Sequence, residues 1–175
     1  MNNEQEHASP MEWLDESFRS SPSQYRVAKL LLTHGISVKG CKAYCGTIEI
    51  TDTSISRACG VDRRVVRTTL ERISSTPSLD SKFSKLSSTL SMVDLAPEIG
   101  CSSLVIIPTD PKMGGILASV MSALYDHGIS VRQAMVNDDG DQDDATLMIV
   151  IDGKLPPEAI PALKACRGVS SILIK

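Results

Sequence analysis

The 175-residue chain has few aromatic residues and no long apolar run. Two Phe, three Tyr and one Trp leave the core to be built from Ile, Leu, Val and Met. No segment approaches the roughly 20 apolar residues that a membrane-spanning helix needs. The first residues also lack the basic-then-apolar pattern of a signal peptide. These absences exclude a membrane partner and predict a cytoplasmic globular protein.

Residues with the chemistry for catalysis or metal binding are scarce. Five cysteines without framework spacing predict reduced thiols. Cys41 and Cys45 could supply half of a metal site, but a structural zinc site needs four ligands, and no second Cys or His pair lies nearby in the sequence. The acidic run at 138–144 fails the spacing of a calcium-binding EF-hand loop. With three isolated histidines and no nucleophile–base pair, we expect no enzyme, no catalytic residues, no cofactor and no metal.

Charge is distributed unevenly along the chain, whose net charge is −3. Residues 23–77 hold nine bases and four acids, which gives +5, whereas residues 1–22 and 101–175 are both acidic. A basic segment inside an acidic chain favours a polyanionic partner for that segment. A solvated surface without any partner explains the same charge, so charge alone leaves both interpretations open.

Two segments are predicted to lie outside the folded domains. Residues 1–22 are polar, acidic and poorly periodic, so we expect a flexible N-terminal segment. Residues 78–100 begin with a break rich in Ser, Thr and Pro, and then repeat apolar side chains at about helical spacing. This pattern predicts a connecting helix between two domains. The repeat consists of Leu79, Phe83, Leu86 and Leu90.

Residues 23–77 contain the pattern of a helix-turn-helix domain. A short helix ends at Gly60, Val61 lies in the turn, and Asp62 caps a second helix. A second helix with arginines on its outward face fits the DNA major groove, where Arg can donate two hydrogen bonds to guanine. Polar side chains of the preceding helix would contact phosphates. The candidate DNA-binding residues are Thr53, Ser54, Arg57, Arg63, Arg64, Arg67 and Thr68, and Glu71 lies on the same stripe.

The same helix pair has a second interpretation. Charged outer faces are common on paired helices, and many helix-turn-helix domains serve only as contacts between proteins. The basic charge and the outward arginines favour DNA as a partner. An adaptor that acts on another protein remains the alternative.

Residues 101–175 predict the element order β-α-β-β-α-β, which is the ferredoxin-like arrangement. Adjacent glycines, Gly114 and Gly115, begin the first helix, where free backbone N–H groups and the helix dipole favour an anion or a carboxylate. The strands at 104–107 and 147–151 are apolar on both faces, so both faces of the sheet need a cover. Since both helices lie on one face, the other face would meet a second copy or the N-terminal half. We therefore expect a homodimer.

Residues 102–175 resemble an ACT domain, a small regulatory module that senses amino acids. The chain as a whole is similar to an archaeal group of regulators of amino-acid metabolism. That group combines an N-terminal helix-turn-helix with a C-terminal ACT domain. The residues that carry the resemblance are 104–107, 114–117 and 124–131 for the ACT domain, and 48–50 and 60–67 for the whole chain.

The resemblance implies an α+β chain with an N-terminal (winged) helix-turn-helix-like domain and a C-terminal ferredoxin-like ACT domain. In that family an amino acid binds at a subunit interface, against the first strand-helix turn and the second strand. This implies an amino-acid-sensing transcriptional regulator that binds DNA. The alternative is a regulatory subunit that acts on an amino-acid biosynthetic enzyme. The implied ligand-binding residues are Asp110, Met113, Gly114, Gly115, Ile116, Leu117 and Gln133.

Overall fold

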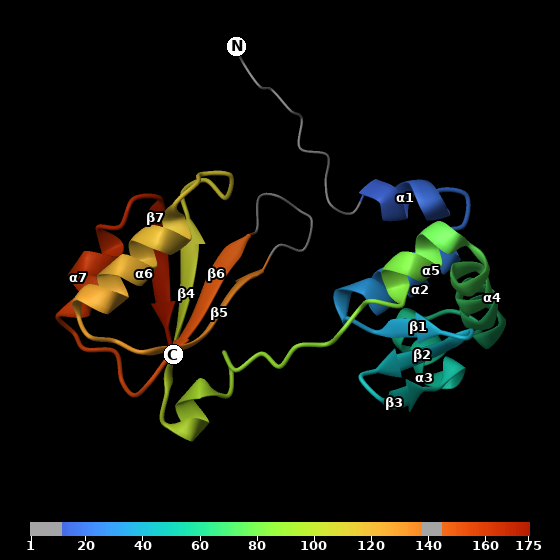
Figure 1. Cartoon of the computed structure of the whole chain (residues 1–175), viewed down its shortest axis with the longest axis horizontal. Helices are drawn as coiled ribbons and strands as arrows, with labels where there is room; N and C mark the ends of the chain where they lie inside the picture. The colour runs from blue at the N-terminus through green and yellow to red at the C-terminus, as the bar shows by residue number, and fades with distance from the viewer. Residues whose placement is uncertain (1–11, 138–144) are drawn as a thin grey trace, which may run out of the picture. The chain divides into compact units, whose positions relative to one another are not determined.

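The computed structural model describes residues 12–137 and 145–175, and the chain divides into two compact units, 1–89 and 90–175. Both units combine helices with an antiparallel sheet (Figure 1). Within the described residues, no helix is long and apolar enough to cross a membrane. Nor do those residues gather three His, Cys, Asp or Glu side chains that could hold a metal ion. The acidic run at 138–144 lies outside the described residues.

The first unit packs five segments of helix around a small sheet. The helices are α1 (Glu12–Phe18), α2 (Pro22–Thr33), α3 (Asp52–Cys59), α4 (Arg63–Ser75) and α5 (Pro77–Phe83). The sheet, in the order β1-β2-β3, consists of β1 (Ser37–Lys39), β2 (Lys42–Cys45) and β3 (Ile48–Ile50). Apolar side chains from every helix meet in one core. The residues of α4 that face this core are Val66, Leu70 and Ile73.

Helix α1 belongs to this core, which differs from the flexible segment predicted for residues 1–22. Leu14 and Phe18 are buried. The guanidinium of Arg72 lies 4.8 Å from the centre of the Phe18 ring and donates a 2.7 Å hydrogen bond to the backbone oxygen of Ser17. Apolar burial and this polar contact hold α1 in place. The prediction for residues 1–11 lies outside the described residues.

Residues 78–100 do not form the predicted connecting helix. Helix α5 ends at Phe83, and the next helical segment is a 3₁₀ turn, η1 (Ala96–Ile99). Between them lies a stretch rich in serine, whose side chains compete with the helix for backbone hydrogen bonds. Leu79 and Phe83 are buried in the first unit, but Leu90 is 67% exposed. The apolar repeat is therefore split between the two units.

The second unit has the predicted β-α-β-β-α-β order, and the ferredoxin-like prediction is confirmed. Its neighbouring strands are antiparallel, in the order β5-β6-β4-β7. Helices α6 and α7 lie on one face of this sheet (Figure 1). The elements are β4 (Ser102–Pro108), α6 (Ile116–Asp126), β5 (Val131–Asn137), β6 (Thr146–Ile151), α7 (Ala159–Lys164) and β7 (Val169–Ile174).

The face of the sheet opposite the helices is covered in part by the chain itself. Val93 and Ala96 are buried there against Val150. The side-chain amide of Gln133 donates to the backbone oxygen of Leu90 at 2.6 Å and accepts from the backbone N–H of Met92 at 2.8 Å. We call residues 90–99 the covering segment. It supplies part of the cover that the apolar strands led us to expect from a second copy or from the N-terminal half.

One polar group lies beneath this cover. The hydroxyl of Ser103, on β4, is buried and has no hydrogen-bond partner among the described residues. Ser103 pairs with Val150 in the sheet, so both side chains point to the covered face. The covering segment therefore meets an apolar surface with one unpaired hydroxyl in it.

Candidate functional site

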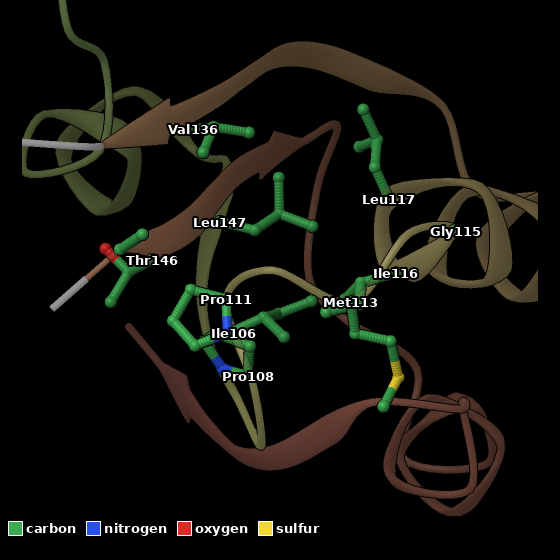
Figure 2. Close-up of a pocket in the computed structure, with 11 residues that line it drawn as sticks. Ile106, Pro108, Pro111, Met113, Gly115, Ile116, Leu117, Val136, Thr146 and Leu147 are labelled. Atoms are coloured by element: carbon green, nitrogen blue, oxygen red, sulfur yellow. The ribbon is translucent and has the colours of Figure 1, made fainter. Parts of the chain in front are cut away.

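A pocket of about 190 Å³ lies between the start of α6 and the sheet of the second unit (Figure 2). Its walls come from β4, from the turn after β4, from the first residues of α6, and from the ends of β5 and β6. The lining residues are Ile106, Pro108, Pro111, Met113, Gly115, Ile116, Leu117, Val136, Ala145, Thr146 and Leu147.

The lining of this pocket is almost wholly apolar. The hydroxyl of Thr146 is the one side-chain oxygen drawn among the lining residues in Figure 2, and no charged side chain lines the pocket among the described residues. Leu117 is 43% exposed and Val136 61% exposed, although both are large apolar side chains. The pocket thus suits an apolar group, and its wall includes apolar surface that the unit leaves open to solvent.

The turn before α6 brings backbone N–H groups to the edge of this pocket. Asp110 organises the turn, since its side chain accepts from the N–H of Lys112 at 2.9 Å and its backbone oxygen from that of Met113 at 3.0 Å. Gly115 then begins α6 with a φ of +91°, a left-handed conformation that favours glycine. No side chain in the described part of the chain caps the helix. The N–H groups of its first turn are therefore available to a ligand.

Gly168 packs behind this turn. Its backbone oxygen accepts from the N–H of Thr109 at 2.9 Å. A Cβ atom at this position would lie 2.8 Å from Cγ1 of Ile116 and 2.9 Å from Sδ of Met113. The absence of a side chain at Gly168 allows two pocket residues to pack directly against the turn between α7 and β7.

The implied ligand-binding residues fall into two groups. Met113, Gly115, Ile116 and Leu117 line the pocket. The other three do not line it: the Asp110 carboxylate is engaged in its own turn, Gly114 lies in the turn away from the lining, and Gln133 holds the covering segment on the opposite face of the sheet.

A β-bulge explains the position of Gln133. On β5, Val131 pairs with Ile151 and Gln133 pairs with Val150, so the register shifts between them. Without this shift Gln133 would share a face with Val131, which packs in the core beneath the helices. The bulge instead returns Val136 to the helix side, beside Leu147. The resemblance placed Gln133 beside the turn, whereas the bulge directs its side chain to the opposite face of the sheet.

The other lining residues were absent from the sequence-based set. They are Ile106, Pro108, Pro111, Val136, Ala145, Thr146 and Leu147. Ile106 and Leu147 were predicted as strand residues, and only their pairing shows that both face the pocket. The two prolines were the available signal, because Pro108 ends β4 and Pro111 lies in the same turn as the glycines.

The predicted DNA-binding residues gather on α3 and α4 of the first unit. Asp62 accepts a 2.7 Å hydrogen bond from the N–H of Arg64 and so caps α4 as predicted, after a turn at residues 60–62. Thr51 caps α3 in the same way through the N–H of Ser54, at 3.2 Å. All seven candidates are exposed: Thr53, Ser54 and Arg57 on α3, and Arg63, Arg64, Arg67 and Thr68 on α4.

A groove of about 450 Å³ lies between α4 and the β2–β3 ribbon. Two ion pairs border it, Lys42 with Glu49 at 2.8 Å and Arg67 with Glu71 at 3.2 Å. The hydrogen bond from Lys42 to Glu49, together with the charge of that carboxylate, raises the pKa of Lys42. Two of the bases that line the groove are therefore paired with carboxylates. Its lining residues are Gly40, Cys41, Lys42, Glu49, Ile50, Thr51, Asp52, Thr53, Arg63, Arg67 and Glu71.

Cys41 and Cys45 are engaged separately near this groove. The backbone N–H of Cys41 donates to the hydroxyl of Ser74 at 3.0 Å, and the Cys45 thiol donates to the hydroxyl of Ser88 at 3.4 Å. Both thiols are free.

Comparison with known protein families gives one match. Residues 115–168, from the glycine that begins α6 to the glycine that packs behind the pocket, match the ACT domain family. The second unit contains an ACT domain. The pocket lies at the start of the first helix of this ACT domain, and its β4 wall precedes the matched span.

No curated protein sequence matches the chain. Among solved structures, one titled "Crystal structure of PH0061" is similar at 11% sequence identity. The match covers 87% of this chain and 88% of the chain in that structure. Its TM-score is 0.28, which is too low to support a structural argument.

Proposed function

We propose that the chain is an amino-acid-sensing regulator in which the ACT domain binds a small aliphatic amino acid. The observation that carries the proposal is the apolar pocket at the uncapped start of α6. An aliphatic side chain would occupy the pocket, and the carboxylate of the same amino acid would accept from the N–H groups of the first turn of α6. At about 190 Å³ the pocket is smaller than the roughly 300–1,000 Å³ typical of drug-sized sites, which favours a small ligand.

The proposal includes a homodimer formed through the ACT domain. Its support is the exposed apolar surface at the pocket, since Val136 and Leu117 are partly in solvent. A second copy placed against these side chains would bury them and would exclude water from the ligand. The opposite face of the sheet supports the dimer less, because the covering segment already occupies part of it.

We also propose that α3 and α4 form a helix-turn-helix that binds DNA. In support, Arg57, Arg63 and Arg64 are exposed and form no ion pair with other described residues. These arginines are free to meet phosphates or guanine edges. In a dimer, an amino acid bound to the ACT domains would change the relation between two such helices, and so couple ligand binding to DNA binding.

A regulatory subunit that contacts a biosynthetic enzyme is the second candidate. The neutral groove beside α4 favours it, because paired charges suit a protein surface better than a phosphate backbone. In either case we expect binding without catalysis. Arg64→Ala separates the two candidates, because it would weaken DNA binding and leave the capture of an enzyme unchanged.

Calorimetric titration with each of the twenty amino acids tests the sensor. We expect heat from Val, Leu or Ile, and little from Asp or Lys, since none of the described residues that line the pocket offers a charged partner for their side chains. Leu117→Asp would abolish binding by placing a carboxylate in the apolar wall. Leu173→Asp is the matched control, because Leu173 is an exposed apolar residue outside the pocket. Absence of heat with every aliphatic amino acid would overturn the sensor.

Fluorescence anisotropy with genomic DNA fragments tests the proposed DNA binding by α3 and α4. Binding is expected at low salt, where contacts with phosphates are strongest. Arg64→Ala would weaken it several-fold, whereas Arg167→Ala, in the ACT domain, would not. A protein that binds no DNA at low salt is not a DNA-binding regulator.

A further inference from the structure

The groove beside α4 contains as many acids as bases. It is bordered on one side by the β2–β3 ribbon and on the other by α4. Arg63 has no ion pair there among the described residues, but the other two bases are each held by a carboxylate. The formal charge of the lining is therefore zero, inside a segment whose overall charge is +5. The three bases are Lys42, Arg63 and Arg67, and the three acids are Glu49, Asp52 and Glu71.

The ribbon pair joins neighbouring strands. Lys42 lies on β2 and Glu49 on β3, and in the sheet Glu49 is directly opposite Tyr44, so Lys42 reaches it diagonally. The ammonium and the carboxylate are 2.8 Å apart, and both side chains are about half exposed. An exposed pair of this kind contributes little to folding. Its main effect is to neutralise the one lysine that lines the groove.

The helix pair has the less favourable order. Arg67 precedes Glu71 by one turn on α4, whereas helices are stabilised more when the acid precedes the base. The guanidinium and the carboxylate are 3.2 Å apart, and both side chains are largely exposed. Helix stability therefore does not explain the acid at position 71. The carboxylate of Glu71 instead pairs with Arg67, an arginine on the outward face of α4.

We propose that Glu49 and Glu71 are specificity-determining residues, which suppress indiscriminate binding of the DNA backbone in the groove by neutralising Lys42 and Arg67. This inference rests on the proposed DNA binding by α3 and α4. A phosphate that enters the groove has to displace a carboxylate from its cation and then remains beside that carboxylate. Contacts by the unpaired arginines must hold the duplex in place before the exchange is favourable. Repulsive elements of this kind separate specific from non-specific partners.

The test compares Glu49→Gln, Glu71→Gln and the double variant with the full wild-type chain. The probe is a random-sequence DNA duplex, and its affinity is measured by anisotropy over a range of salt concentrations. We expect the double variant to bind roughly ten-fold more tightly at low salt. Since each neutralised phosphate contributes about −0.9 to the slope of log K against log salt, two released cations would steepen that slope by up to about 1.8.

Glu16→Gln is the matched control, because it removes the same charge from an exposed position of the first unit outside the groove. It should leave affinity and slope close to wild type. If wild type binds DNA and Arg64→Ala weakens binding, but the glutamine variants keep the wild-type affinity and slope, the inference is overturned and the proposed function stands. If neither wild type nor the double variant binds at low salt, both are overturned. A wild type that binds DNA, together with a double variant that binds more tightly and with a steeper slope, supports the inference.

Discussion

The two units of the chain present hollows of opposite chemistry. The groove of the first unit is larger and lined by equal numbers of acids and bases, whereas the pocket of the second unit is smaller and almost wholly apolar. Attraction between exposed charges is screened by salt over roughly 8 Å at physiological ionic strength. Burial of apolar surface depends on the area removed from water. Added salt should therefore weaken the binding of a charged partner in the groove, and it should leave the affinity of the pocket for its ligand largely unchanged.

Each unit also holds one added segment by polar contacts, and in the second unit these include an ion pair of 2.8 Å between Lys175 and Asp94 of the covering segment. Arg72 holds α1 by a hydrogen bond to the Ser17 backbone and also donates to the side chain of Gln24 on α2. Gln133 holds the covering segment through two backbone groups. Arg72 is backed by Phe18, which is buried in the core. The covering segment places only Val93 and Ala96 as buried apolar side chains on its sheet. The comparison predicts that the covering segment is the less stable of the two.

The largest effect is expected from Gly168→Ala. Both Gly168 and Gly153 have a positive φ, which costs an alanine about 1–2 kcal/mol. Only at Gly168 would the new Cβ meet other atoms, and overpacking adds about 1–3 kcal/mol. Denaturant unfolding should show a greater loss of stability for Gly168→Ala than for Gly153→Ala, and ligand heat should fall only in Gly168→Ala. Equal losses would mean that the pocket wall is loosely packed.

An intermediate effect is expected from Gln133→Ala. Removing its amide leaves the Leu90 oxygen and the Met92 N–H without this partner, a loss of about 1–3 kcal/mol in the local stability of the covering segment. Hydrogen exchange at the Met92 amide should accelerate accordingly. Val136→Ala, on the same strand but on the pocket side, should weaken amino-acid binding and leave Met92 protected. The reverse pattern would place Gln133 in the ligand site after all.

The smallest effect concerns two of the partly buried thiols, Cys59 in the first unit and Cys166 in the second. Burial raises the pKa of Cys59 and of Cys166 above the ordinary value of 9.0. The folded thiol therefore keeps its proton at a pH where the unfolded thiol has lost it, so the stabilisation is complete below pH 9.0 and declines as the pH rises beyond it. Denaturant unfolding of Cys166→Ala should show a shallower decline than wild type. If the stability of Cys166→Ala falls with pH as steeply as that of wild type, other titrating groups cause the decline.

The fold was largely predictable because its signals are local. Apolar runs predicted strands of the ACT domain, and Gly115 marked the start of its first helix, where it adopts a positive φ. The prediction failed for residues 78–100, where Leu79 and Phe83 enter one core and the covering segment joins another sheet. Helical spacing does not reveal which core an apolar side chain enters, because that depends on tertiary contacts.

The candidate site was only partly predictable, for a related reason. The residues that adjoin the Gly115 turn lie next to one another in the sequence and were found together. Val136 and Leu147 reach the pocket through strand pairing, and the bulge beside Arg132 moves Gln133 to the other face. Register is a property of two strands, so one strand's alternation could not fix it.

Ser103 gives the covered face a further consequence. A buried hydroxyl without a partner costs about 1–3 kcal/mol, and this cost is incurred only while the covering segment keeps water away from it. Whenever residues 90–99 lift from the sheet, water can solvate the hydroxyl and recover part of that energy. The unpaired hydroxyl of Ser103 therefore lowers the free energy needed to lift the covering segment from the sheet of the ACT domain.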